Sequence, residues 1–238
     1  MKIKVTGYYR QWMRDKEPMT RNRWIQYVAK PMVFAACLIP LVILIIKALT
    51  GHLGANPIEA TTRSMGDWAL RFLLITLAVT PLKHLLKWDW LIRFRRMLGL
   101  FAFFYACLHF LSYAGLDQFF ALDEIIKDVI KRPFITVGFT SFLLLIPLAI
   151  TSTNKMIKRL GKRWQPLHRL IYLIGIGGVI HYFQLVKADT RNPTIYAIIL
   201  VILLSYRLWA KWIQNKGAGY RYDRLKIGNL PRSSPKQP

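Results

Sequence analysis

Six stretches of the chain are apolar nearly throughout, and each is long enough to cross a membrane. A bilayer core needs about 20 mostly apolar residues per helical span. The predicted spans are residues 31–48, 67–86, 97–115, 133–151, 168–187 and 193–212. The pattern predicts an all-α integral membrane protein, a six-transmembrane helix bundle. This membrane domain covers residues 31–212 and is flanked by a basic N-terminal segment (1–30) and a basic tail (213–238).

The charge of the chain is large and unevenly placed along it. The formal net charge is +24, and 54% of the residues are hydrophobic. Of the 35 Lys and Arg residues, 27 fall on the side of the membrane that holds the N-terminus: before residue 31, in 83–96, in 152–169 and from Arg207 onward. Cationic segments stay in the cytoplasm, so both termini are predicted to be cytoplasmic. Because topology explains the charge, we expect no nucleic-acid partner, whereas anionic membrane lipid suits the basic surface.

Three histidines lie in or next to these apolar spans: His109, His168 and His181. Ionisable residues at membrane depth are candidates for a functional site, and neutral histidines on neighbouring helices suit axial ligation of haem iron. The alternative for His109 is a purely structural role, as a polar contact between helices. His109 and His181 are expected at a similar depth in the outer half, where they could hold one haem between them. His168 lies nearer the cytoplasmic surface and could bind a second, inner haem.

One difficulty concerns the helix that carries both His168 and His181. Their separation of thirteen positions places the two side chains about 140° apart around an ideal helix. A bend or bulge would be needed for both to face the bundle interior. Gly175, Gly177 and Gly178 lie between them and could permit it.

Two further residues are weaker candidates for the haem site. His84 has a depth that would match His168, so it could be the second inner ligand, or simply an interfacial residue like Lys83. Arg71 lies within the second span. Its side chain could extend to the outer surface or make a bidentate contact to a haem propionate. The chain has no C-x-x-C-H motif, so any haem would be bound non-covalently.

Several sequence blocks resemble a known family, the haem-binding subunits of the periplasmic protein-methionine-sulfoxide reductase (the MsrQ or YedZ family). These blocks are Arg95-Arg-Met-Leu-Gly-Leu followed by His109, Leu160-Gly-Lys-Arg-Trp-Gln-Pro-Leu-His168-Arg, and Ile180-His-Tyr182. The segments Gly54–Pro57, Arg132–Thr136 and Thr151–Asn154 also fit. The resemblance runs from about residue 30 to 212. The family it points to belongs to the larger group of ferric-reductase-like transmembrane proteins.

The resemblance implies a function and a set of ligands. The three family histidines map to His109, His168 and His181. Family members bind haem b, are reported to bind FMN, and pass electrons across the bacterial inner membrane to a periplasmic molybdopterin subunit that reduces methionine sulfoxide. The resemblance thus implies a multi-pass inner-membrane electron-transfer subunit, itself not catalytic.

The chain departs from its larger relatives in two ways. They carry two histidines on each of two helices, whereas here the place 14 residues before His109 is Arg95. They also carry a cytoplasmic flavin and nicotinamide domain, for which the tail is too short. Electrons are therefore expected from the quinone pool or from a separate flavin reductase. A cationic segment formed by Lys158, Arg159, Lys162 and Arg163 is a candidate for attracting a flavin phosphate or an acidic reductase.

Two other functions stay open on sequence alone. One is a cytochrome b subunit that serves a different periplasmic reductase. The other is a small proton-coupled transporter whose histidines relay protons.

Overall fold

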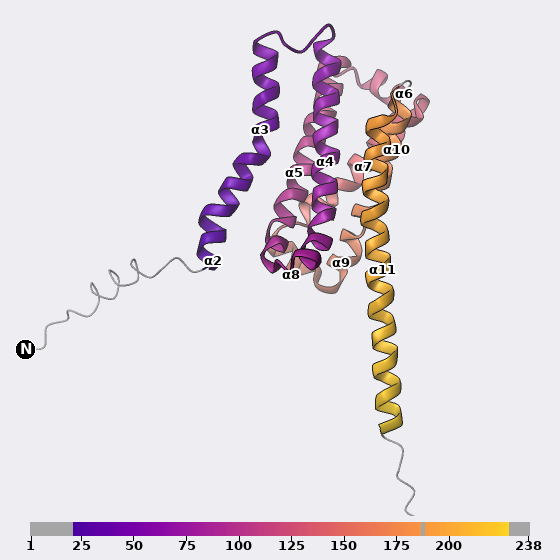
Figure 1. Ribbon diagram of the computed structural model, residues 1–238. Coiled ribbons are helices and arrows are strands. Elements are labelled where there is room, and N and C mark those ends of the chain that lie inside the picture. Colours follow the sequence, from indigo (N-terminus) through magenta and orange to yellow (C-terminus); the bar gives the residue numbers. More distant parts are fainter. Residues whose placement is uncertain (1–20, 187–188, 229–238) are drawn as a thin grey trace, which may run out of the picture.

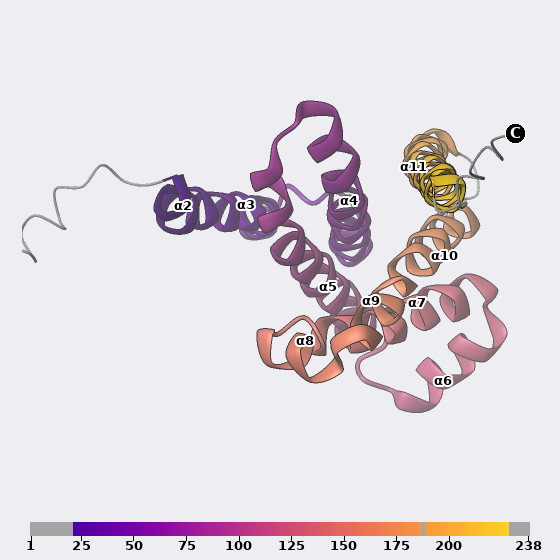
Figure 2. The same cartoon turned by 90° about the horizontal axis from the view of Figure 1, so that it is seen from below.

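Four helices form the centre of the molecule. The computed structural model describes residues 21–186 and 189–228, and within these ranges every regular element is helical. The central helices are α4 (Pro57–Leu86), α5 (Arg95–Ser112), α7 (Pro133–Ile150) and α10 (Leu170–Leu185). On opposite sides of them stand α3 (Lys30–Leu49) and α11 (Arg191–Gly228) (Figures 1 and 2). The all-α prediction is therefore confirmed for the described residues.

Short helices close the two ends of the bundle. We call the end with the loop between α3 and α4 the upper end, as it stands in Figure 1, and the opposite end the lower end. The upper end carries η3 (Tyr113–Asp117) and α6 (Leu122–Lys131). The lower end carries η2 (Asp89–Arg93), α8 (Asn154–Leu160), η4 (Gly161–Arg163) and α9 (Trp164–His168). The helix of α3 is preceded by α2 (Arg21–Trp24) and η1 (Ile25–Ala29).

Within the residues that the structure describes, five helices are long and apolar enough to cross a membrane. They are Ile25–Leu49, Pro57–Leu86, Arg95–Asp117, Pro133–Ile150 and Arg191–Ala210. The fifth of the six predicted spans corresponds to α10, which has only 16 residues and is shorter than the other five. A multi-pass membrane protein follows from these helices. At the far end of the chain, α11 continues beyond residue 212, the boundary expected for the membrane domain, to Gly228.

Helix α4 begins ten residues before the span that hydropathy predicted. Asn56 precedes it, and its side-chain oxygen accepts a hydrogen bond from the Glu59 backbone N–H at 3.2 Å. Pro57 occupies the first helical position, which suits a residue without an N–H. An ion pair between Arg63 and Glu59 at 2.6 Å adds to this first part of the helix. These polar residues hid the start of α4 from a hydropathy criterion, although they stabilise it.

The core lies between α4 and α5, with α3 packed against it. Leu77 and Tyr105 are completely buried there. The Tyr105 hydroxyl donates to the Cys37 backbone oxygen at 2.8 Å, which ties α5 to α3. Cys37 is itself a buried free thiol, in keeping with a small packing residue.

Candidate functional site

His109 and His181 meet inside the upper half of the bundle. His109 comes from α5 and His181 from α10, and their ring centres lie 6.1 Å apart with the planes at 73°. Two imidazoles that each bond one metal at about 2 Å have ring centres about 6 Å apart. The separation therefore fits a single metal between the two rings.

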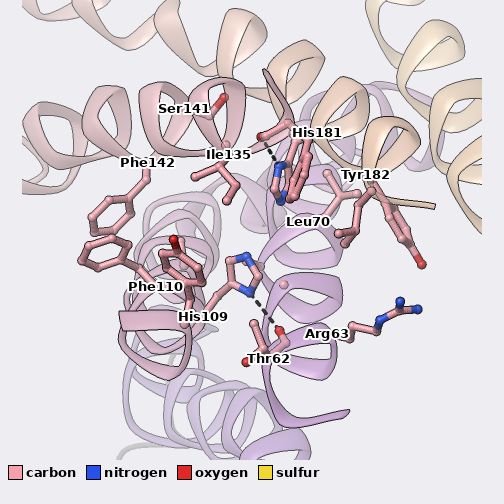
Figure 3. A pocket seen from close by; sticks show the side chains of 18 of the residues that line it. Thr62, Arg63, Leu70, His109, Phe110, Ile135, Ser141, Phe142, His181 and Tyr182 are labelled. Carbon is pink, nitrogen blue, oxygen red and sulfur yellow. Dashed lines mark hydrogen bonds between the residues drawn. The ribbon is translucent and has the colours of Figure 1, made fainter. Parts of the chain in front are cut away.

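The hydrogen bonds of the two rings fix their tautomers. His109 Nδ1 lies 2.8 Å from the Thr62 backbone oxygen, and His181 Nδ1 lies 2.6 Å from the Phe134 backbone oxygen. A carbonyl oxygen only accepts, so each Nδ1 carries the proton and each Nε2 keeps a free lone pair. Figure 3 shows these second nitrogens directed toward each other across the cavity. Metal-bound histidines are held by this kind of bond from the other ring nitrogen, so the pair fits bis-imidazole ligation.

Two glycines make room for the rings. A Cβ atom on Gly66 would lie 3.0 Å from the His109 ring, and one on Gly138 would lie 2.7 Å from His181 Nδ1. Each histidine therefore lies directly against a helix backbone, which is what brings Nδ1 within reach of a carbonyl four residues earlier on that helix. The sequence analysis singled out neither glycine, although both contact the candidate site.

A cavity of about 670 Å³ contains the histidine pair. This volume is within the range of cofactor pockets, about 300–1,000 Å³. Its walls are mostly apolar and include Leu70, Phe110 and Phe142, the last two stacked with their ring centres 5.1 Å apart. Polar residues also line it, among them Arg63 and Arg132. Apolar walls, a facing imidazole pair and two nearby guanidinium groups fit a flat apolar macrocycle with carboxylate substituents.

The two halves of the site are copies of one arrangement. In both, 47 residues separate the histidine from the carbonyl that it contacts. The glycine follows that carbonyl by four residues in each case: Gly66 after Thr62, and Gly138 after Phe134. The segment Leu-Leu-Ile-Thr-Leu-Ala-Val-Thr (73–80) of α4 also recurs as Leu-Leu-Ile-Pro-Leu-Ala-Ile-Thr (144–151) in α7. The hairpins α4–α5 and α7–α10 thus resemble an internal repeat. The glycines and the histidines recur after 72 residues and this segment after 71, so an alignment on the segment alone pairs Gly66 with Val137 and not with Gly138.

His168 lies outside this cavity. Its ring stacks on Trp164 at 4.1 Å between centres, and its Nε2 lies 3.0 Å from the Thr151 hydroxyl oxygen. Because Thr151 donates its proton to the Pro147 backbone oxygen at 2.6 Å, Nε2 acts as the donor to Thr151. The helix that was expected to carry both His168 and His181 is interrupted between them: α9 ends at His168, and α10 begins after Arg169.

The weaker candidates also lie away from the histidine pair. His84 Nδ1 contacts the Tyr206 hydroxyl at 3.2 Å in an exposed position. Arg71 donates to the Tyr196 hydroxyl at 2.8 Å, lies over the Trp68 ring and does not line the cavity. The four cations of the segment 158–163 are exposed, on α8 and η4. Among the described residues no group of three or more His, Cys, Asp and Glu could hold a metal ion by itself.

Comparison with known proteins places the chain in a family. Residues 65–179 match the model of the ferric-reductase-like transmembrane component. The heme-binding subunit MsrQ of protein-methionine-sulfoxide reductase from Herminiimonas arsenicoxydans is 58% identical over 77% of this chain and 85% of its own length. Its counterparts from Rhodospirillum rubrum and Caulobacter vibrioides are 56% and 51% identical, over 74% and 82% of this chain and 85% and 92% of theirs. No solved structure matches. The chain therefore belongs to the MsrQ family, the heme-binding subunits of protein-methionine-sulfoxide reductase.

Proposed function

We propose that the chain carries electrons through one haem b held between His109 and His181, and delivers them to a periplasmic molybdopterin-containing methionine-sulfoxide reductase. The observation that carries this proposal is the facing pair of Nε2 atoms, each left free by a bond from Nδ1 to a backbone carbonyl. Haem b supplies a one-electron carrier of adjustable potential. The protein supplies ligand orientation and an apolar cavity. The names of the relatives give no support to a transporter function.

The guanidinium groups of Arg63 and Arg132 are better placed than Arg71 to hold haem propionates. Both line the cavity, and both are about half-exposed. Each already has one carboxylate neighbour, Glu59 for Arg63 and Asp128 for Arg132 at 3.1 Å. Planar guanidinium groups bind carboxylates through two parallel hydrogen bonds. These two residues would set the orientation of the haem edge that faces the upper end.

His168 is not included among the ligands of this haem. Its Nε2 is engaged by Thr151, and the positive charge of Arg95 lies within electrostatic range. A second haem bound by His168 and His84 would require His168 to leave the Thr151 hydroxyl and His84 to leave the Tyr206 hydroxyl. FMN as a further cofactor is suggested by the family resemblance alone. The cations Lys158, Arg159, Lys162 and Arg163 would attract a flavin donor that reduces the protein without quinol.

We expect reduced protein to lose its electrons only to the complete acceptor system. Purified protein should show a reduced-minus-oxidised haem b spectrum. After chemical reduction and removal of the reductant, the haem should reoxidise when the periplasmic reductase subunit and methionine sulfoxide are both added. With either addition alone, no more than one equivalent of haem should be reoxidised. A haem that stays reduced with both present would contradict the proposed acceptor.

The direction of electron flow requires the upper end to face the periplasm. Reporter fusions after Asn56, Asp123 and Asp189 should give the outer signal, and fusions after Trp88, Asn154 and Asn215 the inner signal. The physical reason is the clustering of Lys and Arg at the lower end and at both termini. An outer signal at Asn154 would reverse the proposed direction and exclude an acceptor at the upper end.

A further inference from the structure

Helix α6 has an apolar face of which only part is packed against the bundle. On the packed part, Ile125 is buried and Val129 lines the cavity. The other apolar side chains, Leu122, Ile126 and Ile130, are 70%, 57% and 76% exposed. Residues four apart lie on the same side of a helix. These three residues therefore form a continuous apolar stripe, which we call the α6 stripe.

Polar contacts fix the rotation of α6 and keep the α6 stripe exposed. Asp128 accepts a hydrogen bond from the Tyr113 hydroxyl at 2.9 Å and pairs with Arg132 at 3.1 Å. The Val129 backbone oxygen accepts a further hydrogen bond from the Thr136 hydroxyl of α7. Tyr113 and Arg132 themselves line the cavity. One side of α6 is thus held against the bundle, so the stripe cannot turn inward.

Two exposed phenylalanines precede the stripe in the sequence. Phe119 and Phe120 both have left-handed backbone conformations, with φ of 48° and 60°. This conformation is unfavourable for residues with a Cβ atom and is rare for bulky ones. The Phe120 N–H donates to the Ala114 backbone oxygen at 2.7 Å, which helps to hold the turn. A strained turn that exposes two aromatic rings beside an apolar helix face indicates a contact outside the chain.

The place of α6 in the chain determines what surrounds it. The preceding spanning helix ends at Asp117, and the next one begins at Pro133. Residues 118–132 therefore lie where the chain leaves the membrane and enters it again. Figures 1 and 2 show α6 at the upper end and outside α7, at the edge of the bundle. At this level the edge of a membrane bundle is surrounded by lipid headgroups.

The polar side of α6 favours lipid over a charged protein partner. It carries two acids and two bases, Asp123, Glu124, Lys127 and Lys131. Glu124 pairs with Lys127 at 2.7 Å within the helix. Charges of both signs in equal number do not select an acidic or a basic protein surface. Helices with one apolar and one charged side are typical of the interface plane of a membrane.

We propose that the α6 stripe and the two phenylalanines insert into the headgroup region of the leaflet at the upper end. Such helices bury their apolar face about 5–10 Å into the boundary between headgroups and acyl chains. Insertion removes the exposed apolar side chains from water and holds α6 in the membrane plane. Because Asp128 joins α6 to Tyr113 and Arg132, the lipid also supports one wall of the cavity.

The test measures the depth of spin labels in nanodiscs that contain one copy of the full chain and no partner protein. Ile126→Cys puts a label on the α6 stripe. Glu124→Cys is the matched control, because its side chain is also exposed. Two residues turn a helix by about 200°, so this control lies on nearly the opposite side of α6. Labelled wild type, which has Cys37 and Cys107, gives the background.

The measured quantity is the ratio of label collisions with oxygen, which concentrates in the membrane, to collisions with an aqueous nickel complex. The ratio should be at least about threefold higher at I126C than at E124C, because only the stripe reaches the acyl chains. Replacing both phenylalanines, as F119S/F120S, should lower the ratio at I126C. A label at L111C, an exposed position on spanning helix α5, gives the reference value for lipid contact.

Three results would overturn the proposal. The first is equal ratios at I126C and E124C, and the second is an unchanged ratio at I126C in the F119S/F120S background. The third is protection of I126C from the nickel complex only after the periplasmic reductase subunit or a second copy of the chain is added, which would assign the stripe to a protein. No haem signal enters the measurement. A chain without haem would therefore contradict the electron-transfer function and leave the result for α6 standing.

Discussion

Replacing either His109 or His181 by alanine should abolish the bis-imidazole haem b spectrum of the purified protein. Each ring supplies one free Nε2 atom to a cavity with mostly apolar walls. Loss of either ring leaves an iron position without a protein ligand. The two losses should be similarly large, since each histidine supplies one ligand and is held by the same kind of bond to a backbone carbonyl. Absorbance spectra and haem-to-protein ratios of the two variants measure this.

His84→Ala is the matched control for these variants. It removes an imidazole from the same membrane domain, but one that contacts Tyr206 in an exposed position. Its spectrum should equal that of wild type, and all three variants should insert in similar amounts. A His109→Ala or His181→Ala protein with full haem content and unchanged bands would refute the pairing.

Replacing Gly138 by alanine should release most of the haem without touching a ligand. The new Cβ atom would lie 2.7 Å from His181 Nδ1 and 2.8 Å from Cε1. The ring would have to move away from α7, and its bond to the Phe134 oxygen would be lost. Overpacking of this kind costs about 1–3 kcal/mol, which corresponds to roughly a 5- to 150-fold lower haem affinity. Haem retention during dilution, followed by absorbance, gives the affinity.

The glycines provide a graded series for the same experiment. Gly66→Ala should have a smaller effect than Gly138→Ala, because its Cβ would lie 3.0 Å from the His109 ring. Gly99→Ala is the control: its Cβ would meet only the Thr76 methyl group at 3.6 Å, an ordinary contact. Alanine also favours a helix interior by about 1 kcal/mol over glycine. If Gly99→Ala lost as much haem as Gly138→Ala, the ring contact would not be the cause.

Hydropathy predicted the helices of this protein well where apolar residues dominate and poorly where polar contacts define an end. The spans at 97–115 and 133–151 agree closely with Arg95–Asp117 and Pro133–Ile150. The start of α4 at Pro57 was missed, because its first turns are stabilised by an Asn56 cap and an ion pair that lower the local hydropathy. Length along the membrane therefore follows from apolar content, whereas helix ends follow from capping.

The site was predictable to the level of which histidines share a depth. His109 and His181 were expected at one level of the membrane, and they lie together. Each ring is positioned by a contact between two helices, and the two residues in contact are 43 positions apart in the sequence. Gly66 contacts His109, and Gly138 contacts His181. Depth arguments treat one span at a time and contain no information about such contacts. Arg71 was singled out for being charged within a span, yet it is satisfied by Tyr196 and lies outside the cavity.

Each repeated hairpin builds a complete half-site, with its own histidine, its own carbonyl and its own glycine. Two separate copies of such a hairpin would form the same pocket as a symmetric dimer, with identical surfaces facing each other. A symmetric dimer, however, is obliged to carry every change in both copies of the hairpin. Joining the two copies in one chain removes that obligation. The upper ends have stayed alike around His109 and His181, while the lower ends differ, with Arg95 on one hairpin and His168 on the other. Covalent fusion thus lets one bundle keep a two-fold arrangement of side chains at its upper end while the side chains at its lower end differ between the two hairpins.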